Sequence, residues 1–265
     1  LEVGNIYPQA YARAFYEGQK GAGQDDVVNL LRCAWSGSQR FGVLSWSGDI
    51  HSTWTDLRRQ LVAGLHMGVA GIPWYTTDIG GFYGGNIHDD GFRELLVRWF
   101  QFGAFCPVMR MHGYREPWET VIGEDDVERC RSGAENEVWS FGPEIQAIFE
   151  KYIRVREALR PYLRETMDAV RDDGGPVMRT LFYEFPDDEA AWDVSDQFLL
   201  GSHLLVAPIV HGGALSRRVY LPAGATWRDL HSGAVHQGGA TVDIEAPLDT
   251  IPVFARDGAL AGISL

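Results

Sequence analysis

The chain has 265 residues, 45% of them hydrophobic, which suits a globular protein of one large or two medium domains. Its 36 acidic residues outnumber its 23 Lys and Arg residues, and the net charge of −13 argues against a nucleic acid or an anionic membrane surface as a partner. No uncharged apolar run reaches the roughly 18 residues that a membrane helix needs, so no membrane span is expected.

The first part of the chain alternates short apolar runs with helical patterns, which is typical of parallel β/α units. Strands are predicted at 27–33, 41–46, 69–75 and 106–111. Helices are predicted to begin at Pro8, after the N-cap Thr53, at Asp89 and at Pro143, the last one long and kinked by Pro161. The polar stretch from Glu116 to Ser140 is predicted to be a loop.

Beyond Gly175 the pattern changes to alternating or continuous apolar runs between Gly, Pro and Asp turns. Strands are predicted at 177–185, 203–210, 218–221 and 251–255. These runs favour an antiparallel β domain, in the form of a sandwich. We therefore expect two domains, covering residues 1–172 and 173–265.

Three cysteines, Cys33, Cys106 and Cys130, show no metal-ligand spacing. Cys33 and Cys106 lie in apolar runs, so buried free thiols are expected, and the sparse cysteines favour a reducing compartment. The first residues show neither a basic region nor the apolar core of a secretion signal. On this basis a cytoplasmic location is expected.

Three successive strand-like runs end in polar, titratable residues. These endings are Trp46-Ser47-Gly48-Asp49, Thr76-Thr77-Asp78 and Arg110-Met111-His112. The C-terminal ends of parallel barrel strands share one face, so we expect these groups to converge, with Arg32 from the end of the first run. The set indicates chemistry by two carboxylates beside an Arg and a His, with Trp46 and Phe82 as stacking faces.

Each of these residues also has a purely structural interpretation. Asp49 could cap the following helix, Asp78 could begin a turn through an Asx hydrogen bond, and Arg32 could be the counter-ion of Asp78. His112 could be a hydrogen-bonded core histidine. A metal site built from Asp49, His51, His88 and His112 lacks any standard ligand spacing, so no metal is expected.

The motifs also resemble a known family in their order and spacing. Those that carry the resemblance are Trp46-Ser47-Gly48-Asp49 with Trp54, Asp78-Ile79-Gly80-Gly81-Phe82, Arg98-Trp99 with Gly103, Arg110-Met111-His112, Arg179-Thr180-Leu181-Phe182, Glu184-Phe185-Pro186 and Leu205-Val206-Ala207-Pro208. They resemble glycoside hydrolase family 31, of the α-glucosidase and α-xylosidase type, over nearly the whole chain.

The resemblance implies an α/β fold: the C-terminal half (strands 5–8) of a (β/α)8 TIM barrel, followed by an all-β sandwich. It also implies a retaining α-glycoside hydrolase that removes terminal α-linked glucose or xylose from oligosaccharides, without a cofactor. Asp49 matches the general acid/base. The family's nucleophile is an aspartate in a motif that would precede Asn5, and the chain contains no such motif.

The other site residues follow from the same resemblance. Arg32 and His112 match groups that bind sugar hydroxyls, Trp46 an aromatic beside the acid, and Phe82 one near the leaving group. Asp78 matches a pocket carboxylate that we expect to orient Arg32. Arg110 is expected to be a binding cation, and Arg115 is expected to reach the substrate.

Two alternatives to a hydrolase stay open. One is an inert carbohydrate-binding fragment, and the other is an α-glucan lyase or transglycosylase of the same family. The expected partner is an oligosaccharide or glycoside, and a homo-oligomer is left open. Four barrel strands without their neighbours would expose two sheet edges, so we expect the isolated 265-residue chain to aggregate.

Overall fold

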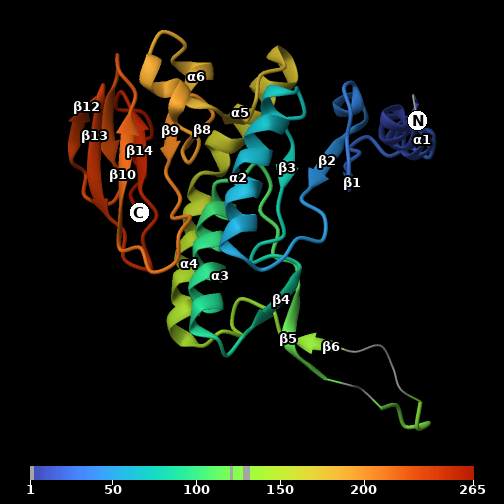
Figure 1. The fold of residues 1–265 in the computed structure, drawn as a ribbon. Helices are drawn as coiled ribbons and strands as arrows, with labels where there is room; N and C mark the ends of the chain where they lie inside the picture. The colour runs from blue at the N-terminus through green and yellow to red at the C-terminus, as the bar shows by residue number, and fades with distance from the viewer. Residues whose placement is uncertain (1–2, 120–121, 128–131) are drawn as a thin grey trace.

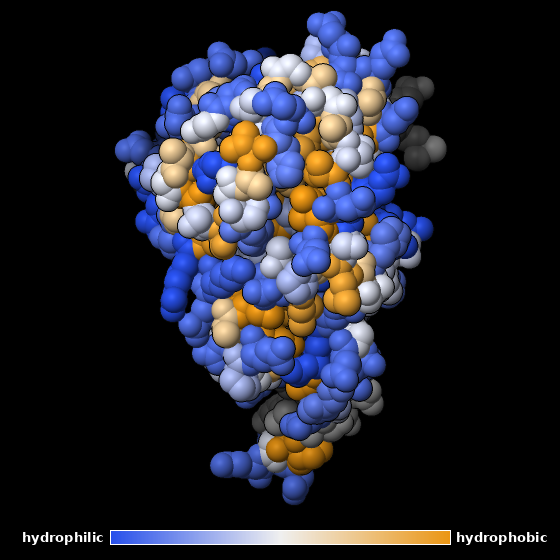
Figure 2. Space-filling view, turned by 90° about the vertical axis from the view of Figure 1, so that its left-hand side faces the viewer, coloured by the Kyte–Doolittle hydropathy of each residue, from blue (hydrophilic) through white to orange (hydrophobic). Residues whose placement is uncertain are grey.

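A computed structural model describes residues 3–119, 122–127 and 132–265. An N-terminal α/β part and a C-terminal β part lie on opposite sides of a layer of long helices (Figure 1). No helix among the described residues has both the length and the apolar character needed to cross a membrane. Seen from the side of the β part, hydrophilic residues cover most of the surface, with apolar residues in small groups between them (Figure 2).

A three-stranded parallel sheet forms the centre of the N-terminal part. Its order is β1 (Asn29–Leu31), β2 (Val43–Trp46) and β3 (Tyr75–Thr76). A single 3-10 turn, η2 (Ser38–Phe41), lies in the connection between β1 and β2, where no regular crossover helix fits. The parallel order therefore places the C-terminal ends of all three strands on one side, as expected.

Helices lie on both sides of this sheet, α1 beside β1 and α2 beside β3 (Figure 1). In chain order they are η1 (Gly4–Ile6), α1 (Tyr7–Gly21), α2 (Trp54–Val69), α3 (Asp90–Ala104), α4 (Pro143–Ala158) and α5 (Arg160–Asp173). The side chains of Thr53 and Asp89 accept the backbone N–H groups of the third helical residues. This confirms the predicted N-cap Thr53, and it makes Asp89, which was predicted as the first helical residue, the N-cap of its helix. The predicted long helix is divided at Leu159, because Pro161 fits only the first turn of a new helix.

Two of the predicted barrel strands are wrong in extent. The third was expected at 69–75, but α2 continues to Val69 and β3 is only Tyr75–Thr76. The fourth, at 106–111, is not a regular strand, since Pro107 offers no N–H to a ladder. It still lies beside β3: Val108 N donates to Tyr75 O at 3.3 Å, and Ile79 forms a parallel bridge with Met111.

The polar stretch that was predicted to be a loop contributes two strands. β4 (Tyr83–Asn86) pairs in parallel with β5 (Tyr114–Glu119), which pairs antiparallel with β6 (Ser132–Ala134). Residues 120–121 and 128–131 of this stretch, with Cys130, lie outside the described residues. Cys106 is buried as expected, whereas Cys33 is exposed, because β1 ends at Leu31.

The C-terminal part is an antiparallel sandwich, as predicted. A six-stranded sheet has the order β12-β11-β14-β9-β8-β7, and β10 (Ser216–Leu221) pairs with β13 (Ala240–Glu245) in a second sheet. The six strands are β7 (Met178–Arg179), β8 (Phe198–Leu200), β9 (Leu204–Val206), β11 (Thr226–Asp229), β12 (Val235–Gln237) and β14 (Val253–Arg256). The strand predicted at 177–185 stops at Arg179, where α6 (Leu181–Glu184) and then η3 (Glu189–Asp193) follow.

The strands β8, β9 and β14 of the six-stranded sheet are buried on both faces. Leu199 and Leu205 belong to the core shared with β10, whereas Phe198 and Leu204 belong to the core shared with the long helices. This alternation follows from the two-residue period of a strand. Phe102 of α3 meets Phe198 edge to face at 6.0 Å, so the two parts of the chain share one continuous apolar core.

Arg98 of α3 joins the same two parts of the chain by hydrogen bonds. Its side chain is 1% exposed and donates to the backbone carbonyls of Ala246 at 2.7 Å and Thr250 at 2.8 Å. It also reaches the carbonyls of Pro247 and Ala214. One guanidinium thus satisfies carbonyls that no backbone ladder reaches.

We predict that Arg98→Met in the complete gene product lowers the melting temperature by roughly 5–10 °C, because it leaves the buried carbonyl of Ala246 and the partly buried carbonyls of Thr250 and Ala214 without their donor. Differential scanning calorimetry measures this shift. Arg154→Met removes an exposed arginine of α4 and is the matched control, with an expected change below about 2 °C. Equal shifts for the two variants would contradict the structural role of Arg98.

Candidate active site

The C-terminal ends of the sheet strands bring two ion pairs together. Arg32, just after β1, donates from Nη2 to Asp49 Oδ2 at 2.8 Å, and Asp49 lies in the loop after β2. Asp78, after β3, pairs with Arg110 from the segment beside β3. Each pair therefore joins the ends of two neighbouring segments of the sheet.

This arrangement corrects one expectation. Asp78 was expected to orient Arg32, or Arg32 to be its counter-ion, but Asp78 pairs with Arg110 and Arg32 pairs with Asp49. The reason is the strand order, since β2 lies between β1 and β3. An arginine at the end of β1 therefore lies next to the loop after β2 and is separated by that loop from the end of β3.

Trp46 lies between the two ion pairs. The guanidinium of Arg32 is 5.5 Å from its ring, and that of Arg110 is 5.9 Å from it. Both distances are in the range of cation–π attraction. The last residue of β2 therefore lies beside both arginines, one of which, Arg32, pairs with Asp49. The side chain of Asp49 is 29% exposed and can be reached from outside.

Asp78 is the most deeply buried charge of the site. Its side chain is 0% exposed, and its Oδ2 atom has no hydrogen-bond partner among the residues that the structure describes. Burial raises the pKa of Asp78 to about 6, although the nearby Arg110 opposes this shift; the charge of Asp49 raises the pKa further. Asp49 is thus close enough to Asp78 for their charges to interact.

His112 and Phe82 complete the group. Their rings lie 5.4 Å apart at 32°. Burial lowers the pKa of His112, and the positive charge of Arg110 lowers it further, so the ring is held neutral near pH 7. The structure therefore brings all seven sequence-predicted residues into one connected group: Arg32, Trp46, Asp49, Asp78, Phe82, Arg110 and His112.

Sequence reasoning missed the residues that hold this group in place. Ser47 Oγ accepts the backbone N–H of Asp78 at 3.1 Å and so joins the loops after β2 and β3. Gly81 has a φ of +79°, and a Cβ there would lie 2.6 Å from Ser52 N, so the two loops touch through a glycine. A single serine after a strand gives no pattern from which such a role could be predicted.

Arg115 was expected to reach the substrate, and this is wrong. Its side chain is 0% exposed and donates to the carbonyls of Ile79 at 2.9 Å and Gly81 at 2.8 Å, and to Asn136 Oδ1 at 2.8 Å. Burial lowers the pKa of Arg115 to about 10. Arg115 therefore holds in place the loop that leads from β3 to Phe82.

Within the described ranges 3–119, 122–127 and 132–265, no group of three or more His, Cys, Asp or Glu side chains is arranged to hold a metal ion.

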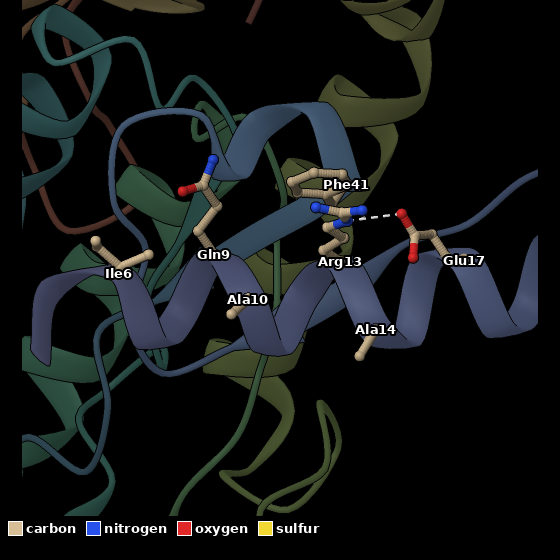
Figure 3. A pocket seen from close by; sticks show the side chains of 7 residues that line it. All are labelled: Ile6, Gln9, Ala10, Arg13, Ala14, Glu17 and Phe41. Atoms are coloured by element: carbon tan, nitrogen blue, oxygen red, sulfur yellow. Dashed lines mark hydrogen bonds and ion pairs between the residues drawn. The ribbon is translucent and has the colours of Figure 1, made fainter. Parts of the chain in front are cut away.

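A hollow of about 340 Å³ lies along α1, where Phe41 and the ion pair between Arg13 and Glu17 border it (Figure 3). None of the seven site residues lines that hollow.

The raised pKa of Asp78 predicts a pH dependence of stability. The folded state holds the proton more tightly than the unfolded chain, whose aspartate titrates near 3.8. Ionisation of Asp78 therefore works against folding, and its cost grows as the pH rises from about 4 to about 6. We therefore compare the melting temperatures of the complete gene product and its Asp78→Asn variant. The difference, wild type minus variant, should fall as the pH rises across this window and level off above it.

Calorimetry at pH 4, 5, 6 and 7 measures this difference. Asp243→Asn, which removes an exposed carboxylate of β13, controls for the change in net charge. A difference that is flat, or that grows with pH, would contradict the buried state of Asp78.

Two models of protein families together match nearly the whole chain. The model described as the glycosyl hydrolases family 31 TIM-barrel domain matches residues 1–166, and that described as the glycosyl hydrolase family 31 C-terminal domain matches residues 174–260. An α-xylosidase of Saccharolobus solfataricus is 37% identical over 98% of this chain and 34% of its own length. An uncharacterized family 31 glucosidase of Pseudescherichia vulneris is 66% identical over 44% of this chain and 22% of its own length.

A solved structure agrees with these sequence matches. The GH31 α-xylosidase from a soil metagenome, complexed with xylose, is 55% identical, with a TM-score of 0.94 over 99% of this chain and 39% of its own. The chain spans about a third of the length of the curated relatives that it matches nearly from end to end. It forms an open part of the barrel together with the β domain that follows, and it belongs to glycosyl hydrolase family 31.

Proposed function

We propose that this chain supplies the general acid/base of a retaining α-glycosidase that removes terminal α-linked xylose or glucose. The observation that carries the proposal is the ion pair between Arg32 and Asp49 at the shared strand ends. Asp49 is the partly exposed carboxylate of the group, whereas Asp78 is fully buried and paired with Arg110. A group that exchanges a proton with substrate must be accessible, so the reacting carboxylate is Asp49.

The mechanism assigns Asp49 two tasks. As an acid it donates its proton to the glycosidic oxygen while a second carboxylate, roughly 5 Å away, attacks the anomeric carbon. The ionised Asp49 then accepts a proton from the water that releases the sugar. Arg32 stabilises the carboxylate that remains between these two steps. We assign the nucleophile to a residue outside this chain, because the buried Asp78 cannot approach a sugar ring.

The other members of the group bind and orient the sugar. His112 is held neutral by its surroundings, so its ring nitrogens can both donate to and accept from hydroxyl groups. Arg32 and Arg110 offer donors, and Trp46 and Phe82 offer aromatic faces. Asp78 holds Arg110 in position through their ion pair.

Xylose is the sugar that we favour. Among the named relatives, the 55% identical structure is an α-xylosidase complexed with xylose, and the Saccharolobus relative is also named an α-xylosidase. An α-glucosidase of Bacillus thermoamyloliquefaciens is 35% identical, so terminal glucose is the second choice. Comparing 4-nitrophenyl α-xyloside with the α-glucoside decides between them, and the released free sugar distinguishes a hydrolase from a lyase or a transglycosylase.

We also propose a domain boundary between residues 172 and 173. The last long helix, α5, ends at Asp173, and Gly174 follows it in a left-handed conformation. One family model matches the chain up to residue 166, and the other matches it from residue 174, so the boundary lies between the two matches.

We predict that Asp49→Ala in the complete gene product lowers kcat/KM on natural glycosides by about 10² to 10⁴-fold. Aryl glycosides with good leaving groups need no protonation and should keep measurable activity. Steady-state kinetics on both substrate types measures the contrast. Asp243→Ala, at an exposed carboxylate of β13, should leave both unchanged. An equal loss on both substrate types for Asp49→Ala would rule out the acid role.

A further inference from the structure

The loop that carries Asp49 is built from two short turns. Ile50 N donates to Gly48 O at 3.0 Å, so Asp49 is the middle residue of a three-residue turn. Thr53 N donates to His51 O at 2.9 Å and closes a second turn of the same kind. A three-residue turn has only one backbone hydrogen bond of its own. The direction of the Asp49 carboxyl therefore depends on the contacts that anchor the loop.

On one side the loop is anchored by backbone hydrogen bonds to the start of β4. Ile50 O accepts Phe82 N at 2.8 Å and Tyr83 N at 2.9 Å. Ser52 N donates to Tyr83 O at 3.0 Å. These bonds hold Ile50 and Ser52, whereas His51, the residue between them, is held from the opposite side by a side chain of α2.

That side chain is the carboxylate of Asp56. Its Oδ2 atom accepts the backbone N–H of His51 at 2.9 Å. Asp56 is the third residue of α2, and its own N–H donates to the side chain of the N-cap, Thr53, at 3.1 Å. The side chain of Asp56 is 13% exposed, so most of the carboxylate is shielded from water.

This hydrogen bond differs from ordinary helix capping. In the usual capping box the third helical residue reaches back to the N–H of the N-cap residue itself. Asp56 reaches two residues further, to His51, which is only two residues from Asp49. The bond therefore joins the first turn of α2 directly to the loop that carries the acid/base.

We propose that Asp56 is a positioning residue for the acid/base: its carboxylate fixes the loop after β2 to α2 and so sets the direction in which Asp49 presents its proton. The inference rests on the proposed function, because it takes Asp49 to be the proton donor. Without Asp56 the nucleophile and the sugar-binding residues stay in place. Only substrates whose leaving group must be protonated then lose rate, whereas a general structural defect slows all substrates alike.

The test measures kcat/KM of the complete gene product on a series of aryl α-xylosides, from 4-nitrophenyl to unsubstituted phenyl. If glucose is the sugar removed, the corresponding α-glucosides replace them. The slope of log kcat/KM against the pKa of the leaving phenol reports how much protonation the leaving group receives. Asp49→Ala, which removes the acid, should make this slope steeper and is the reference.

Asp56→Ala should lower kcat/KM on the phenyl glycoside roughly tenfold and leave that on the 4-nitrophenyl glycoside within about twofold, because the acid is displaced and not removed. Asp56→Asn keeps a side-chain oxygen that can accept the same N–H, and it should restore the wild-type slope.

Asp89→Ala is the matched control. The carboxylate of Asp89 accepts Phe92 N at 2.7 Å in the first turn of α3, so its removal also costs one capping hydrogen bond. It should lower the melting temperature by a similar amount and leave the slope unchanged. If Asp56→Ala does not fold, Asp56→Glu replaces it, since a glutamate there completes the usual capping box and draws the carboxylate from His51 to Thr53.

The outcomes separate the two claims. If Asp49→Ala does not make the slope steeper, the proposed function fails. If Asp49→Ala does so but the Asp56 variant lowers kcat/KM equally on every aryl glycoside, or on none, the positioning role of Asp56 is overturned.

Discussion

The order of three short parallel strands governs the whole site. Because β1, β2 and β3 are neighbours in that order, their ends can pair charges only between adjacent segments: Arg32 with Asp49, and Asp78 with Arg110. Trp46, at the end of the middle strand, lies between both arginines. Topology thus separates the accessible carboxylate, Asp49, from the buried one, Asp78. The reacting and positioning roles that we propose follow this separation.

Support for these strand ends comes from the rest of the molecule. Arg115 and Gly81 bind the loops after β2 and β3 to each other, and Arg98 secures α3 against carbonyls of the β domain. The six-stranded sheet contacts the helices with one face and its partner sheet with the other. The β domain therefore acts as a platform that fixes the helices, and through them the loops that carry the site.

Much of this could be predicted from the sequence, because local signals agreed with the fold. Thr53 was recognisable as a cap and Asp89 as a helix start, and the polar endings at Asp49, Asp78 and His112 indicated a common rim. The choice of ion-pair partner could not be predicted, since it depends on which strands are adjacent. The burial of Arg115 was missed because its partners are backbone carbonyls, which leave no pattern in a sequence. The strand at 106–111 failed because Pro107 interrupts the ladder that its apolar neighbours suggest.

The most direct test of the central claim treats the complete gene product with a cyclitol epoxide, which traps the nucleophile of a retaining glycosidase, followed by peptide mapping and a crystal structure of the adduct. The account predicts one labelled carboxylate that is neither Asp49 nor Asp78, with the Asp49 carboxyl roughly 5 Å from it and facing the position of the glycosidic oxygen. A label on Asp78, or an adduct from which Asp49 points away, would contradict it.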